Sequence, residues 1–238
     1  MKQISFAFLF FFISLIAIIL ENLNNFLPAL ITRALIIPAL MIFYHLRVKG
    51  NYSLFHRLIL FALLFAWFGD LLLQFSKKGI DLYFDSSTFF LLGIASFSFT
   101  QIFYSVAFNL PRGKNRIFTS RIYQLLMILG YGFLILWLLY NKLITETANY
   151  RFPVILYTMI ILFMLGSALN RYGKVNGVSY MLVTIGALLF VFSDSLLAIN
   201  RFYEKIDFAR IIILASYILA QYLIAMGSLR QDFSREEV

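Results

Sequence analysis

The sequence of 238 residues contains no cysteine, only two histidines and few charged residues. Without cysteine the chain has no disulfide, no thiolate nucleophile and no cysteine-ligated metal centre. His45 and His56 alone do not supply the ligand set of a zinc site, so we expect neither a metal nor another cofactor. Only 13% of the residues are charged and 62% are hydrophobic, which excludes an ordinary soluble domain of this length.

Most of the sequence consists of long apolar runs. A helix needs roughly 20 apolar residues to cross about 30 Å of hydrocarbon. Eight such runs cover residues 4–20, 27–46, 54–75, 86–108, 122–140, 152–170, 178–199 and 208–229. The first run is followed by ENLNNFLP, which lacks a small-residue cleavage site, so we expect it to be retained as a span. We predict an all-α integral membrane bundle of eight transmembrane helices, with residues 1–238 as one polytopic domain.

Basic residues are unevenly distributed between the loops on the two sides. The side of the N terminus has twelve: Lys2, Arg47, Lys49, Arg57, Arg112, Lys114, Arg116, Arg121, Arg171, Lys174, Arg230 and Arg235. The opposite side has seven: Lys77, Lys78, Lys142, Arg151, Arg201, Lys205 and Arg210. Because cytoplasmic loops are enriched in Lys and Arg, we predict a protein of the cell membrane (inner or plasma membrane) with both termini cytoplasmic. Their scatter over short loops indicates contact with the lipid bilayer and no nucleic-acid partner.

Two parts of the chain resemble each other. The segment FGDLLL around Asp70 matches FSDSLL around Asp194, and the span after each contains a glutamine, Gln101 or Gln221. The aspartates are 124 residues apart and the glutamines 120. This offset equals an even number of spans, so matching helices have the same orientation in the membrane. We predict two parallel four-helix repeats.

Three charged residues lie inside apolar runs. At 1.5 Å per residue, Asp70 and Asp194 lie roughly 7 Å inside the non-cytoplasmic ends of their helices, and Arg33 is about level with them. Gln101 and Gln221 lie roughly 18 Å deep. A charge in hydrocarbon costs at least about 2.5 kcal/mol, so we expect these side chains to face the interior of the bundle. The positions of these five residues predict a polar pocket that opens toward the outer face.

The charges in this pocket do not balance, because Arg33 neutralises only one of the two aspartates. A desolvated carboxyl group without a cation favours its protonated form. A protonated acid beside an ionised one suits acid and base hydrolysis of an activated ether or acetal, and equally a proton relay in a carrier. Alternatively, Arg33 and the glutamines only hold helices together. The residues alone therefore leave an enzyme, a carrier and a structural protein open.

Five segments carry a more specific pattern. They are FAWFGDLLL (65–73), GIASFSFTQIFYSVAF (93–108), PVILYTMIILFMLGSA (153–168), GALLFVFSDSLLAINRF (186–202) and SYILAQYLIAMG (216–227). Together they resemble the YhhN-like lysoplasmalogenase family of multispan membrane proteins. The chain departs from the family pattern at Gln101, where the family usually has histidine, and at TRALIIP (32–38), where it usually has a Lys-Pro pair.

The resemblance implies an enzyme that hydrolyses the vinyl ether bond of lysoplasmalogens to a fatty aldehyde and a glycerophospho-alcohol. Its substrate would be a lysophospholipid. Asp70 and Asp194 match the family's paired acids, one as proton donor and the other as base. The expected substrate-binding residues are Arg33, which orients the acids or binds the phosphate, and Gln101, Tyr104, Tyr157 and Gln221, which line the cavity. A non-enzymatic lipid or proton-coupled carrier with the same pocket is the alternative function, and the oligomeric state is left open.

Overall fold

The computed structural model describes residues 3–23, 26–48, 52–78, 85–110, 122–145 and 148–231, which form helices and no strand. The long helices are α1 (Gln3–Asn22), α2 (Phe26–Val48), α3 (Leu54–Lys78), α4 (Ser86–Asn109), α5 (Ile122–Thr145), α6 (Arg151–Leu169), α7 (Gly177–Ala198) and α8 (Ala209–Leu229). A 3₁₀ turn, η1 (Ala148–Tyr150), precedes α6, and a π-helical turn, η2 (Ile199–Tyr203), continues α7. Eight helices are long and apolar enough to cross a membrane. The predicted all-α membrane bundle is confirmed.

Each predicted span lies on one helix, and the differences are at the ends. The first apolar run stops at residue 20, but α1 continues to Asn22 and so includes Glu21. Glu21 is only 6% exposed, because its carboxylate has a polar partner inside the bundle. A charged residue therefore extends this helix where the hydropathy pattern predicted its end.

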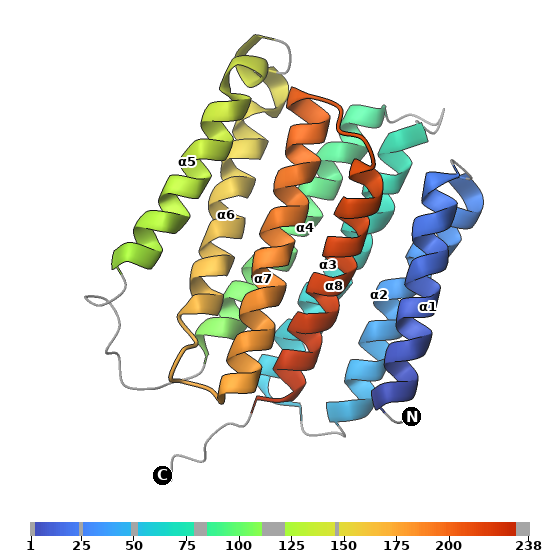
Figure 1. The fold of residues 1–238 in the computed structure, drawn as a ribbon, viewed down its shortest axis with the longest axis vertical. Helices are drawn as coiled ribbons and strands as arrows, with labels where there is room; N and C mark the ends of the chain where they lie inside the picture. The colour runs from blue at the N-terminus through green and yellow to red at the C-terminus, as the bar shows by residue number, and fades with distance from the viewer. Residues whose placement is uncertain are drawn as a thin grey trace.

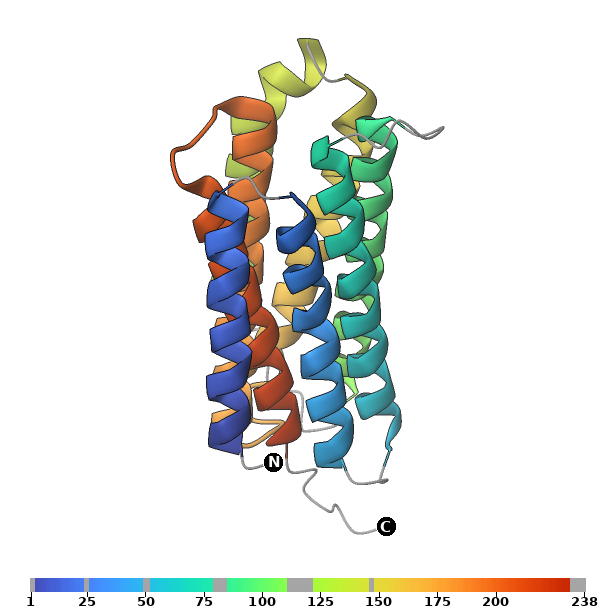
Figure 2. The same cartoon turned by 90° about the vertical axis from the view of Figure 1, so that its right-hand side faces the viewer.

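The helices form two facing layers. One layer contains α1, α8 and α7, and the other contains α2, α3 and α4 (Figures 1 and 2). α6 contacts both α4 and α7 and so closes the bundle at one edge, and α5 packs outside it against α6 and η2. α1 and α2 form the opposite edge. The layers are joined near the middle by contacts of α8 with α2 and α3.

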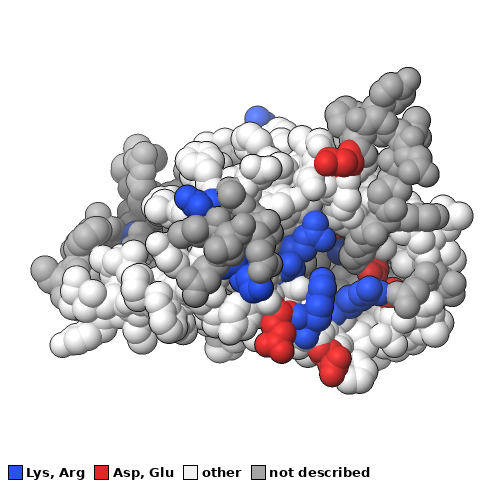
Figure 3. Space-filling model, turned by 90° about the horizontal axis from the view of Figure 1, so that it is seen from above, with Lys and Arg blue, Asp and Glu red and all other residues white. Residues whose placement is uncertain are grey.

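Successive helices alternate in direction, so α1 begins and α8 ends at the same end of the bundle (Figure 1). At the opposite end, Lys and Arg side chains gather on the surface (Figure 3). The exposed basic residues of that end include Arg151, Arg201, Lys205 and Arg210. Much of the predicted orientation depends on residues outside the described ranges, namely Lys2, Lys49, Arg112, Lys114, Arg116, Arg121 and Arg235. The cytoplasmic location of the termini stays a prediction.

The α7–α8 pair is packed backbone to backbone at two glycines. A Cβ atom at Gly186 would lie 2.9 Å from the carbonyl oxygen of Ala220, and one at Gly227 would lie 3.0 Å from the backbone nitrogen of Val183. Small residues permit such close approach between membrane helices, where van der Waals packing replaces the hydrophobic effect. α3 and α4 form the other intimately packed pair, as expected if α3–α4 and α7–α8 correspond in the predicted repeats.

Arg171, in the loop between α6 and α7, fastens that loop to the end of α8. The residue is fully buried, and its Nη2 donates to Ser179 Oγ at 2.8 Å and to Gln231 Oε1 at 2.7 Å. The guanidinium carbon lies 5.2 Å from the ring centroid of Phe108. Burial lowers the pKa of Arg171 to about 10, so the side chain stays cationic at neutral pH. Its interactions are with neutral and aromatic groups of the described residues.

A proline in α2 creates the contact between α2 and α3. Pro38 has no N–H group, so the carbonyl of Ala34, one turn earlier, loses its helical partner. The indole Nε1 of Trp67 on α3 donates to this carbonyl oxygen at 2.9 Å. In hydrocarbon a free carbonyl is costly, and the indole removes that cost. Trp67 is therefore a packing residue that fixes α3 against α2.

We expect Trp67→Phe to destabilise the protein by about 1 to 2 kcal/mol, because it leaves a buried carbonyl without a donor. Thermal unfolding in detergent measures the effect. The matched control is Trp137→Phe, since Trp137 on α5 is 66% exposed. Equal unfolding temperatures for the two variants would show that the indole hydrogen bond does not stabilise the bundle.

Candidate active site

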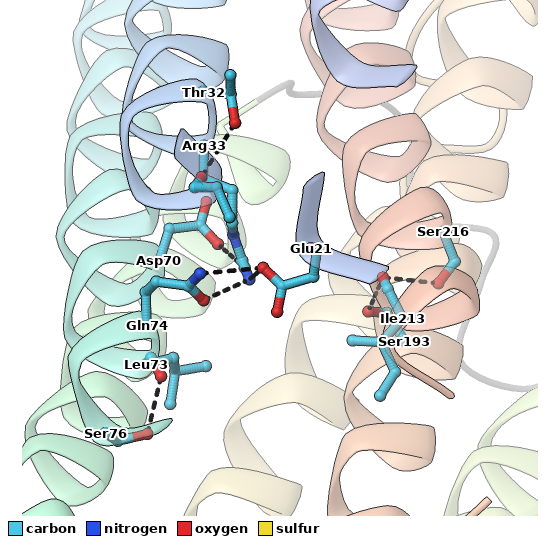
Figure 4. A network of polar contacts seen from close by, with 11 residues as sticks. Glu21, Thr32, Arg33, Asp70, Leu73, Gln74, Ser76, Ser193, Ile213 and Ser216 are labelled. Atoms are coloured by element: carbon cyan, nitrogen blue, oxygen red, sulfur yellow. Dashed lines mark hydrogen bonds and ion pairs between the residues drawn. The ribbon is translucent and has the colours of Figure 1, made fainter. Parts of the chain in front are cut away.

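Arg33 on α2 is the centre of an ion-pair network that joins three helices (Figure 4). Its Nη2 donates to Asp70 Oδ1 on α3 at 2.8 Å, and its Nη1 donates to Gln74 Oε1, one turn further along α3, at 3.2 Å. Gln74 Nε2 in turn donates to Glu21 Oε2 on α1 at 3.0 Å. The Arg33 Nη1 and Glu21 Oε2 atoms are 3.7 Å apart. Asp70 is thus held as the partner of a cation.

Glu21 is the functional-site residue that sequence reasoning missed. It follows the first apolar run directly, so the hydropathy pattern alone assigns it to the loop after the span. Since that end of α1 faces the start of α2, Glu21 lies beside Arg33 in the folded chain. Two carboxylates, Asp70 and Glu21, therefore surround this one arginine. The charge balance drawn from the sequence, which counted only the two aspartates, omitted one acid.

Asp194 on α7 has a different environment. The hydroxyl group of Tyr157 on α6 donates to Asp194 Oδ2. Among the described residues no Lys or Arg forms an ion pair with Asp194. The neighbouring Ser195 Oγ accepts from the hydroxyl of Tyr131 on α5 at 2.8 Å. Asp194 is near enough to Asp70 for the two charges to interact, but it has a neutral partner where Asp70 has a cation.

The two aspartates have partners at the same sequence spacing. Arg33 precedes Asp70 by 37 residues, and Tyr157 precedes Asp194 by 37 residues. The equivalent helix therefore supplies the partner in each half, which agrees with the predicted parallel repeats. Arg33 forms an ion pair with Asp70. Tyr157 instead forms a hydrogen bond with Asp194, and both groups in this bond are neutral when the acid is protonated.

Asp194 and Tyr157 border a pocket inside the bundle. Its walls come from α3, α4, α5, α6, α7 and η2. Its polar lining residues are Tyr131, Tyr157, Thr158, Asp194 and Ser195, and its other lining residues are aliphatic, aromatic or glycine. Sites for small molecules typically have few polar groups in apolar walls. The pocket has the properties of a binding site for a largely apolar molecule.

A cluster of three aromatic rings lies beside the pocket. Tyr217 on α8 lies 5.8 Å from Phe97 and 5.4 Å from Phe190, measured between ring centroids. The Tyr217 hydroxyl lies near Asp70, and Phe97 lines the pocket. Asp70 itself is not one of the residues that line the pocket.

The remaining predicted residues lie deeper and do not line the pocket. The Tyr104 hydroxyl on α4 donates to Gln221 Oε1 on α8 at 2.6 Å, and both residues are fully buried. Gln101 is also fully buried and lies near Tyr157, and its amide oxygen and nitrogen have no hydrogen-bond partner among the described residues. The structure thus brings Tyr157 and Asp194 together at the pocket, places Arg33 with Asp70, and joins Tyr104 to Gln221.

Comparison with known proteins identifies relatives over most of the chain. The profile of the YhhN family matches residues 28–228. Lysoplasmalogenase TMEM86A of Bos taurus is 29% identical over 184 residues, which are 76% of this chain and 67% of that protein. Lysoplasmalogenase TMEM86B of Mus musculus is 31% identical over 142 residues, or 59% of this chain and 54% of that protein. The match thus spans about half the length of the mouse relative. No solved structure matches this chain.

We expect Arg33→Gln to destabilise the protein by about 3 kcal/mol or more, since two buried carboxylates lose their cation. Asp70→Asn has a smaller effect, because Arg33 keeps Glu21 as a partner. Thermal unfolding in detergent measures both, with Arg57→Gln, an exposed arginine, as the control. An Arg33→Gln effect no larger than that of Arg57→Gln would contradict a structural role for the network.

Proposed function

This chain belongs to the YhhN family, and on that basis we propose that it hydrolyses the vinyl ether bond of lysoplasmalogens, giving a fatty aldehyde and a glycerophospho-alcohol. Its relatives from cattle and mouse are lysoplasmalogenases. The observation that carries the proposal is the position of Asp194, a carboxyl group without a cation among the described residues, at the wall of an apolar pocket. A single-chain lipid needs an apolar pocket, and a vinyl ether needs an acid.

Asp194 is the proton donor in the proposed reaction. The protonated carboxyl group transfers its proton to the vinyl carbon distant from the ether oxygen, and the double bond becomes an oxocarbenium ion. Water adds to the cationic carbon while the Asp194 carboxylate accepts a proton from it. The resulting hemiacetal breaks its bond to the glycerol oxygen and gives the aldehyde and the alcohol. One water molecule is consumed, and the acid is regenerated.

The different partners of the two aspartates support this assignment. Arg33 stabilises Asp70 as a carboxylate, which cannot donate a proton. Asp194 has only a tyrosine hydroxyl, and in apolar surroundings an unpaired carboxyl group favours its neutral form. The negative charge of Asp70, near enough to interact with Asp194, favours the oxocarbenium ion electrostatically. Arg33 is engaged with three side chains, so we assign it to holding Asp70 and not to binding phosphate.

Gln101 has a supporting role in this proposal. An amide does not exchange protons at neutral pH as an imidazole does. The buried Gln101 amide near Tyr157 instead favours one orientation of the tyrosine that holds Asp194. Proton transfer is therefore assigned to Asp194 alone, although the family usually has histidine at position 101.

We expect Asp194→Asn to lower the rate of aldehyde release from a lysoplasmalogen at least about 100-fold, as for loss of a general acid. The measurement uses purified protein in detergent and follows aldehyde and, from a matched ester lysolipid, fatty acid. Asp207→Asn is the control, because Asp207 is an exposed acid at the same end of the bundle. A wild-type protein that moves lysoplasmalogen across vesicle membranes without releasing aldehyde would instead be a carrier, and full activity of Asp194→Asn would exclude Asp194 as the donor.

We expect Tyr157→Arg to abolish aldehyde release, because it gives Asp194 the kind of partner that Asp70 has and stabilises the carboxylate. Tyr157→Phe removes only one hydrogen bond, so it retains part of the rate. The rates of both variants are compared with their unfolding temperatures. Equal activity of folded Tyr157→Arg and Tyr157→Phe would contradict the requirement for a protonated Asp194.

A further inference from the structure

Gly132 is an unusual residue for its position. It lies within α5, where glycine weakens a helix, and it is buried on a helix that is otherwise mostly exposed. A Cβ atom at this position would lie 2.4 Å from Cδ1 of Leu162 on α6. Gly132 and Leu162 both line the pocket. The absence of a side chain at residue 132 therefore lets Leu162 lie against the backbone of α5 at the wall of the pocket.

The pocket is more apolar toward the middle of the membrane. Leu162 lies about 7 Å further from the Asp194 end of α6 than Tyr157, at 1.5 Å per residue. Val191 lies about one turn before Asp194 on α7, in the same direction. With Ile161 and Gly132, these residues form a mostly apolar inner end, which Thr158 and Tyr131 adjoin. A molecule that has its reactive group at Asp194 meets mainly apolar side chains beyond it.

The direction of the pocket also indicates a ligand. Its inner end points from Asp194 toward the middle of the bundle, which is the direction of the hydrocarbon chain of a lipid whose headgroup lies at the basic end (Figure 3).

We propose that the inner end of the pocket binds the unbranched hydrocarbon chain of a single-chain lipid, and that Gly132 sets the longest chain that fits. The identity of this chain as the alkenyl chain of the substrate rests on the proposed function. A side chain at residue 132 displaces Leu162 into the pocket and shortens it. Gly132 is a specificity-determining residue in this proposal, and it takes no part in the chemistry.

The first test compares chain-length selectivity in Gly132→Ala, Gly132→Val and Gly132→Leu. The value of kcat/KM is measured for lysoplasmalogens of increasing chain length. We expect the ratio of long-chain to short-chain kcat/KM to fall by about fourfold for each methylene that no longer fits. Gly130→Leu is the matched control, because Gly130 is exposed on the same helix and a Cβ atom there would have no neighbour within 4 Å. An unchanged ratio in folded Gly132→Leu would overturn the proposal.

Val191→Phe fills the same inner end from α7 and serves if the Gly132 variants do not fold. It is expected to lower the same ratio. If folded Val191→Phe keeps the wild-type ratio, the inner end does not hold the chain.

The second test measures binding without turnover. A lysophosphatidylcholine with a photoreactive diazirine at the end of its chain is bound to Asp194→Asn in detergent and irradiated, and the labelled peptides are identified. We expect labelling of Ile161, Leu162 or Val191, and its loss in Gly132→Leu combined with Asp194→Asn. Labelling of these residues together with no aldehyde release by the wild type would refute the proposed function and support the chain site. Aldehyde release together with labelling elsewhere would refute the chain site and leave the proposed function intact.

Discussion

Hydrocarbon offers no hydrogen bonds, and this constraint determines where every polar group of the bundle lies. The Arg33 network joins α1, α2 and α3 because its charged side chains pair with one another inside the bundle. Trp67 lies against α2 because Pro38 leaves a carbonyl free, and Tyr104 meets Gln221 between α4 and α8. These contacts fix the helix positions. A polar group that does not join helices in this way is therefore a candidate for another role.

Asp194 is an acid that has no cation as a partner among the described residues. It occupies the position in the second half that Asp70 occupies in the first, and its partner has the same separation of 37 residues. The first half has an arginine there and the second half has a tyrosine. One residue difference in an otherwise similar arrangement thus gives one carboxyl group a cation as its partner and the other a hydroxyl group, and the proposed function depends on that difference.

The sequence predicted the spans well because hydropathy and helix length depend on local composition. It also predicted Asp70, Asp194 and Arg33 as interior residues, since charges in long apolar runs have few alternatives. Glu21 was missed because an acid at the end of an apolar run reads as a loop residue until its partner on another helix is known. The pocket was beyond prediction in detail, because its walls come from five helices and η2. Which tyrosine meets Asp194 depends on helix rotation, which composition does not specify.

The two edges of the bundle differ in charge and in packing. At one edge, α1 contributes Glu21 to the Arg33 network, so charge-paired side chains join α1 to α2 there. At the other edge, α5 packs against α6 and the short η1 and η2 turns, its Tyr131 donates to Ser195 of α7, and its Gly132 lets Leu162 of α6 lie against the α5 backbone. The Arg33 network contains two carboxylates, Asp70 and Glu21, for one arginine, so it carries excess negative charge when both acids are ionised. In the proposed reaction, protonation of a vinyl ether in the neighbouring pocket creates a cation, and attraction to that charge would lower the energy of the cation without any contact between the substrate and Asp70.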